Sequence, residues 1–117
     1  MVESLGQKQR RFARNVPRLI DMAHNLGFEV TIGDVFRDPR ISGHYGVKKG
    51  YSSKYSNHKL KLAIDLNLFR NGRYLSSTKS HRELGEWWMS QGEDHEWGGA
   101  YGRFDGNHYS LSYKNGW

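Results

Sequence analysis

The chain has 117 residues, which is the length of one domain, so we expect a single domain over residues 1–117. Cysteine is absent, which excludes disulfide scaffolds, cysteine-based zinc fingers and thiol nucleophiles. The formal net charge of +6 favours an anionic partner and leaves nucleic acid, a membrane surface and bacterial wall polymers open. No apolar run approaches the roughly 18 residues of a membrane span, so we expect no stable membrane insertion.

The first elements that the sequence predicts are a helix and a strand. Apolar residues recur at helical spacing over residues 12–26, and Gly27 is a plausible end for this helix. Pro17 lies inside the pattern, so the helix either begins near Asn15 or kinks at the proline. Residues 28–32 alternate between apolar and polar side chains, which predicts a half-buried strand.

The middle of the chain contains an irregular segment and a second strand. Residues 38–57 are rich in Gly, Ser, Lys and Tyr and show no periodicity, which indicates a long loop. Leucine and isoleucine then alternate with Lys, Ala, Asp and Asn over residues 60–68, which predicts a strand with one apolar face. Asn71 and Gly72 follow as a strong signal for a hairpin turn.

A second helix and a last strand complete the pattern. Thr78 or Ser80 is positioned to cap a helix that carries Leu84 and two tryptophans. Residues 108–113 alternate again and predict a final strand that opens with a histidine. Because helices and strands mix with short turns, the sequence predicts an α+β fold.

His58, Asp65 and His108 are candidate metal ligands. Asp65 lies mid-strand on the face opposite the apolar residues, where a carboxylate is costly to bury unless it is paired or metal-bound. Two imidazole nitrogens and one carboxylate oxygen, with a fourth position open, form a zinc site suited to hydrolysis. On residue types alone, a pairing of Asp65 with an arginine and two solvated histidines remains an alternative. The other histidines are interpreted as surface residues: His24, His44, His81 and His95.

Residues 56–65 resemble the S-x-H-x-x-G-x-A-x-D signature of a zinc peptidase family. That family contains the VanY-like D-Ala-D-Ala carboxypeptidases and the L-alanyl-D-glutamate endopeptidases of phage endolysins. Residues 105–109 are similar to its second signature, and residues 97–99 match the W-G-G that often precedes it. Lys61 occupies the glycine position of the first signature. The histidine and aspartate of that signature are an odd number of residues apart, so the chain has to bend between them.

The resemblance implies a small antiparallel sheet with flanking helices, as in the D-Ala-D-Ala peptidases and their hedgehog relatives. It implies that His58, Asp65 and His108 bind Zn2+. It also implies that Asp105 is the general base that activates water and then the acid that protonates the leaving amine.

Two further residues are implied on the substrate side. By resemblance, Arg37, at the end of a short strand over residues 35–37, holds a substrate carboxylate or helps to stabilise the developing oxyanion. Ser56 is a candidate for a hydrogen bond to the peptide. The residues themselves leave simpler roles open, because Arg37 can pair with Asp34 and Ser56 can cap a turn.

We therefore expect a monomeric zinc peptidase that cuts peptidoglycan stem peptides as a phage endolysin, with no nucleic-acid partner. Residues 1–8 lack the apolar stretch of a secretory signal, so we expect accumulation in the host cytoplasm and release to the cell wall through a holin-type pore. The 38–57 loop favours a cleft open at both ends, so the expected bond joins L-alanine to D-glutamate. The alternatives are a D-Ala-D-Ala carboxypeptidase, a non-catalytic zinc-binding wall or virion module, and a basic His/Asp nuclease.

Overall fold

In the computed structural model, which describes residues 2–50, 53 and 55–113, the first element is the long helix α1 (Leu5–Asn25). It begins well before the start that the proline suggested, because Ser4 and Gln7 form a capping box. The Gln7 amide donates to the Ser4 hydroxyl at 3.1 Å, and the Ser4 amide donates to Oε1 of Gln7 at 2.8 Å. The helix continues through Pro17 and ends before Gly27, which has a φ of +89°, so the predicted helix end is confirmed.

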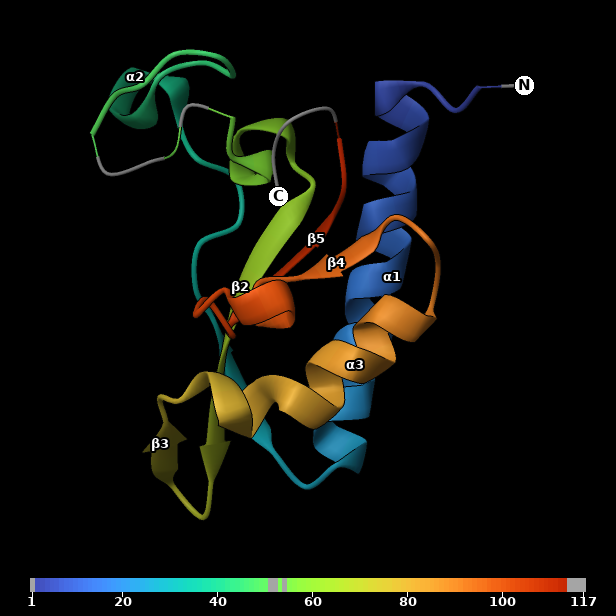
Figure 1. Cartoon of the computed structure of the whole chain (residues 1–117), viewed down its shortest axis with the longest axis vertical. Coiled ribbons are helices and arrows are strands. Elements are labelled where there is room, and N and C mark those ends of the chain that lie inside the picture. Colours follow the sequence, from blue (N-terminus) through green and yellow to red (C-terminus); the bar gives the residue numbers. More distant parts are fainter. Residues whose placement is uncertain (1, 51–52, 54, 114–117) are drawn as a thin grey trace.

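Five strands form one antiparallel sheet around the long strand β2 (Ala63–Arg70) (Figure 1). β1 (Glu29–Ile32) and β3 (Arg73–Leu75) pair with the C-terminal half of β2 on its two edges. β5 (His108–Leu111) pairs with the first residues of β2, and β4 (His95–Trp97) pairs with β5. The strand order is β1-β2-β5-β4, which confirms the predicted α+β fold with a small antiparallel sheet.

Residues with positive φ lie at both ends of β2 and determine where the strand begins and ends. Asn71 and Gly72 both have positive φ, 54° and 75°, as a two-residue hairpin of the I′ type requires, so the predicted turn is confirmed. At the other end, Lys61 adopts a left-handed conformation with φ 59°. The strand therefore begins later than the apolar alternation predicted, and the residues before Lys61 form the 3₁₀ helix η1 (Asn57–Leu60).

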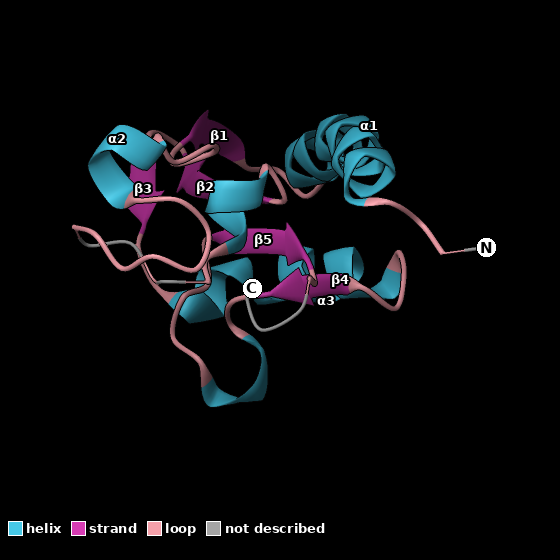
Figure 2. Ribbon diagram, turned by 90° about the horizontal axis from the view of Figure 1, so that it is seen from above, coloured by secondary structure: helices cyan, strands magenta, loops and turns pink. Residues whose placement is uncertain are grey.

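The hydrophobic core lies where α1 and α3 (Arg82–Ser90) pack against the apolar face of the sheet (Figure 1). Seen from above, β1 and β2 lie between α1 and the short helix α2 (Pro39–Ser42) (Figure 2). Within the described part of the chain, none of the helices has the length and apolar character that crossing a bilayer requires. The fully buried large side chains include Leu19, Leu62, Leu66, Leu68, Leu84, Trp88, Trp97, Tyr109 and Leu111.

Some local elements differ from their predictions. Residues 35–37 are not a strand, and the predicted loop over 38–57 contains α2, a single turn capped by Asp38. Neither Thr78 nor Ser80 caps the second long helix. Ser77 instead caps the 3₁₀ helix η2 (Thr78–His81), which runs directly into α3. The sequence did not predict β4, because three residues are too short to show a periodic pattern.

The prediction that His81 and His95 lie on the surface is wrong. Both are buried, with exposed fractions of 3% and 5%. The His81 Nδ1 lies 2.7 Å from the Tyr109 hydroxyl, and burial lowers the pKa of His81 to about 4. The His95 ring packs against Trp88, with centroids 4.3 Å apart. The two other histidines that were assigned to the surface are exposed: His24 and His44.

Candidate metal centre

The register of two neighbouring strands brings Asp65 and His108 together. They are direct cross-strand partners in the antiparallel pair β2·β5, so their side chains point to the same face of the sheet. The Nδ1 of His108 lies 3.5 Å from Oδ1 of Asp65. Asp65 has an apolar neighbour on each side along the strand, Ile64 and Leu66, which face the core instead.

His58 reaches the same carboxylate through the bend that precedes β2. Ser56 caps η1 and accepts a hydrogen bond from the His58 amide at 3.3 Å. The left-handed Lys61 then turns the chain into the strand, and the Leu62 amide donates to the Asn57 carbonyl at 3.0 Å. As a result, Nε2 of His58 lies 3.1 Å from Oδ1 of Asp65. The predicted bend is confirmed, with lysine in the position that glycine would take most easily.

His58, Asp65 and His108 form a compact cluster in which one ligand atom from each lies within 4.8 Å of the others. The two histidines are buried, with exposed fractions of 1% and 3%, and their ring centroids are 5.1 Å apart. The Asp65 side chain is 17% exposed, so the cluster is open to solvent on the carboxylate side. The alternative of an arginine-paired Asp65 with two solvated histidines is wrong, because Asp65 faces two buried imidazoles.

The atoms of this cluster fit a divalent cation. The Nδ1 of His58 lies 2.8 Å from the Val35 carbonyl oxygen, which only accepts, so Nδ1 carries a hydrogen and Nε2 is the ring nitrogen that could coordinate a cation. Burial raises the pKa of Asp65, but the contacts with His108 and His58 outweigh burial and hold that pKa well below its usual range. Two imidazole nitrogens and an ionised carboxylate are a typical ligand set for catalytic zinc.

Arg37 lies beside the cluster and is tied to it through the main chain. Its amide donates to the His58 carbonyl at 3.2 Å. Its guanidinium donates to Asp34 at 3.3 Å and to the Ser56 hydroxyl at 3.1 Å. The pairing with Asp34 and the capping by Ser56, which the residues had left open, are both present. The same contacts orient the Arg37 side chain, which is 15% exposed, toward the segment that carries His58.

Asp105 lies in the turn that leads into β5. Its amide donates to the Gly98 carbonyl at 3.2 Å, and its carbonyl accepts from the His108 amide at 3.0 Å. The residue is exposed, and the cluster found among the described residues does not include it. Its backbone is therefore anchored to the element that carries His108, while its carboxylate stays accessible to solvent.

The backbone contacts that hold the candidate ligands were not predicted from the sequence. The Val35 carbonyl orients His58, but any residue supplies a carbonyl, so no side-chain pattern signals it. Gly33 approaches Asp65 so closely that a Cβ there would lie 3.3 Å from the aspartate Cβ. The Gly33 amide also donates to the Asp65 carbonyl at 2.8 Å. These contacts depend on how the segment after β1 folds over β2.

A buried pair of imidazoles and one carboxylate, open on one side, is the arrangement typical of a single-metal hydrolase. Residues 49–111, more than half of the chain, match a family model described as D-alanyl-D-alanine carboxypeptidase. The chain belongs to this VanY-like family, as its two signatures had indicated, and it is a peptidase of the kind that acts on peptidoglycan. No curated protein matches the sequence.

Proposed function

We propose that this chain is a zinc-dependent endopeptidase that hydrolyses the bond between L-alanine and D-glutamate in the stem peptides of peptidoglycan. The observation that supports the proposal is the convergence of His58, Asp65 and His108, whose ligand atoms all lie within 4.8 Å of one another. Family membership supports the substrate class, because the matched model describes peptidases of wall peptides.

In the proposed reaction, the metal and a nearby side chain have different roles. When bound by His58, Asp65 and His108, zinc would supply Lewis acidity to the scissile carbonyl. Asp105 takes the proton from the attacking water and returns it to the leaving amine. Its exposed position supports this role, because a group that exchanges protons has to reach both water and substrate.

We assign Arg37 and Ser56 to the substrate side of the centre. The Arg37 guanidinium, held by Asp34 and Ser56, offers a fixed positive charge for a carboxylate of the substrate. In an endopeptidase that carboxylate belongs to D-glutamate within the stem. In a D-Ala-D-Ala carboxypeptidase, which the description of the matched family favours, it would be the chain end.

We further propose that the protein acts as a monomeric phage endolysin that reaches the wall from the host cytoplasm through a holin-type pore. The net charge of +6 supports a target in an anionic envelope. Membership of a family that acts on peptidoglycan supports the wall as its site of action.

Clearing of purified cell walls tests the proposal. The wild-type protein is expected to lower the turbidity of a wall suspension, to stop when a chelator is added, and to resume when zinc is restored. Mass spectrometry of the released products then identifies the bond: whole stems released from the glycan support the endopeptidase, and loss of only D-alanine supports the carboxypeptidase. Zinc binding without clearing would indicate a non-catalytic module, and cleavage of DNA or RNA would indicate a nuclease.

A further inference from the structure

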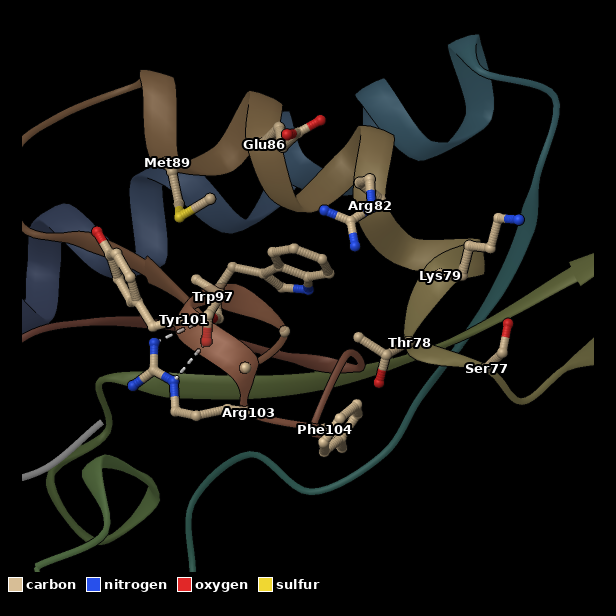
Figure 3. A pocket seen from close by; sticks show the side chains of 13 residues that line it. Ser77, Thr78, Lys79, Arg82, Glu86, Met89, Trp97, Tyr101, Arg103 and Phe104 are labelled. Carbon is tan, nitrogen blue, oxygen red and sulfur yellow. Dashed lines mark hydrogen bonds between the residues drawn. The ribbon is translucent and has the colours of Figure 1, made fainter.

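An open groove of about 640 Å³ lies next to the segment that joins β4 to β5 (Figure 3). One side is formed by η2 and α3, which contribute Lys79, Arg82 and Glu86. The other side is formed by the 3₁₀ helix η3 (Ala100–Gly102) and the residues after it. The buried Trp97 indole lies between the two sides. None of the proposed metal ligands lines this groove.

Two aromatic side chains at the groove are held out in solvent. Tyr101 and Phe104 are each 92% exposed, so neither contributes to the hydrophobic core. Tyr101 also has a left-handed backbone, with φ 57° and ψ 36°, which is strained for a residue with a Cβ. Burial of the Tyr101 side chain does not compensate for this strain. Backbone strain of this kind is typical of ligand-binding and active sites.

The charged groups at the groove are mainly positive. Lys79, Arg82 and Arg103 line it together with a single carboxylate, Glu86. The Arg82 guanidinium lies 6.0 Å from the centroid of the Trp97 ring. Arg103 donates to the Ala100 and Trp97 carbonyls at 3.2 and 3.0 Å, which fixes η3 against β4. Because Arg103 also lies 4.0 Å from a carboxylate oxygen of Glu96, the surplus of positive charge comes from Lys79 and Arg82, and it favours a ligand that carries carboxylates.

The groove and the proposed metal centre share one segment of chain. Phe104 directly precedes Asp105, and the Asp105 amide is bonded to the Gly98 carbonyl. The Gly98 amide in turn donates to the His108 carbonyl at 2.8 Å. The segment that lines one side of the groove therefore continues directly into the residues proposed for catalysis.

We propose that this groove binds the glycan strand of peptidoglycan, with sugar rings against Tyr101 and Phe104 and stem-peptide carboxylates facing the cations. The flat apolar face of a pyranose matches an exposed aromatic ring, and a groove open to solvent admits a chain that is longer than the groove. The inference rests on the proposed function, because it names a second contact with the same substrate.

The test separates wall binding from peptide hydrolysis. Binding to insoluble purified walls is measured by sedimentation on ice, in an Asp105→Asn background that slows digestion. Tyr101→Gly and Phe104→Ser together are expected to weaken wall binding at least tenfold. In a chain that retains Asp105, the same two substitutions are expected to keep the rate of cleavage of a soluble, sugar-free stem peptide within twofold of the wild-type rate. Tyr74→Ser, which removes a tyrosine that is 53% exposed on β3, is the matched control and should leave wall binding unchanged.

Several results would overturn the inference. Unchanged wall binding in the double variant would do so, as would an equal loss of wall binding and peptide cleavage. Failure of soluble N-acetylglucosamine oligosaccharides to compete, or stronger competition by a single-stranded oligonucleotide, would also exclude a glycan ligand. Thermal unfolding controls for folding, because Tyr101→Gly removes the left-handed strain and is expected to maintain or raise Tm. If the wild-type chain binds walls through this groove but cleaves no stem peptide, the proposed function fails while the binding site remains.

Discussion

The Nδ1 of His58 lies 2.8 Å from the main-chain carbonyl oxygen of Val35, and this contact determines which ring nitrogen faces Asp65. Because a carbonyl cannot donate, a hydrogen stays on Nδ1, and Nε2 is left as the ring nitrogen that faces the carboxylate. A second contact, from the Arg37 amide to the His58 carbonyl, holds the same two segments together. The backbone after β1 therefore orients His58, the proposed metal ligand on η1.

The first prediction concerns the metal. His58→Ala is expected to abolish stoichiometric zinc binding and wall clearing together, and to lower Tm, because metal binding is coupled to folding. Metal content after dialysis, measured by elemental analysis, checks this outcome. His24→Ala, on the exposed side of α1, is the control and should retain zinc, activity and Tm. Full zinc occupancy in His58→Ala would exclude His58 as a ligand.

The second prediction separates proton transfer from metal binding. Asp105→Ala is expected to keep its zinc and its fold but to lose roughly 10²–10⁴-fold in rate, the usual contribution of a general acid–base residue. Cleavage rates and metal content are measured on the same preparation. Asp21→Ala removes an exposed aspartate from α1 and should leave both unchanged. A zinc-free Asp105→Ala protein would show that Asp105 is a ligand instead.

The third prediction concerns the strained position before β2. Lys61→Gly is expected to raise the free energy of unfolding by about 1 kcal/mol, because glycine adopts φ 59° without the steric cost of a Cβ. Lys61→Ala removes the same side chain but keeps the Cβ, so no such gain is expected. Urea unfolding of the two variants isolates the backbone effect. Equal stabilities would show that the left-handed conformation costs nothing here.

The fourth prediction concerns a charged contact between α1 and the turn before β4. Asp94 lies 3.1 Å from the Lys8 ammonium and is hydrogen-bonded to Arg11 at 3.3 Å. Burial raises the pKa of Asp94, but the bonds from Arg11 and Lys8 outweigh burial and lower it to about 2. In the unfolded chain the pKa of an aspartate is about 3.9. The stabilisation that the Asp94 contacts provide is therefore complete above about pH 4 and disappears as the pH falls through 2.

Asp94→Asn is therefore expected to lower the free energy of unfolding by about 1–2 kcal/mol at pH 7, a figure discounted for partial exposure. The difference from wild type should shrink below pH 4 and vanish once the pH is below about 2. Denaturant unfolding of both proteins across this pH range provides the measurement. Asp21→Asn is the control, with an expected change below about 0.5 kcal/mol at pH 7. A difference that persists unchanged to pH 2 would contradict the assigned cause.

The fifth prediction concerns two helix glycines, one packed tightly against a tryptophan and one with only a flexible side chain nearby. A Cβ at Gly85 in α3 would lie 2.2 Å from the Trp97 ring, so Gly85→Ala is expected to lower stability by more than about 2 kcal/mol. At Gly6 in α1, the nearest neighbour of a Cβ is the flexible end of Arg10 at 3.3 Å. Gly6→Ala is therefore expected to raise stability by about 0.5–1 kcal/mol. Thermal unfolding of both variants checks the contrast.

The sequence by itself determined the features that depend on neighbouring residues. The Asn71–Gly72 turn follows from the positive φ that both positions require, and the end of α1 follows from Gly27. The resemblance to the two signatures pointed to His58, Asp65 and His108 as ligands, and the odd spacing of the first two required a bend between them. These inferences need no knowledge of distant contacts.

Only the tertiary structure decided which groups surround those residues. β4 exists because it pairs with β5. His81 is buried beside Tyr109 of β5, and His95 is buried against Trp88 of α3. The Val35 carbonyl reaches His58 because the segment after β1 crosses η1, a contact between residues 23 positions apart. Such contacts join segments that are distant in the sequence, and the residue pattern of one segment does not indicate which other segment it contacts. Strand pairing and packing in the folded chain determine these contacts.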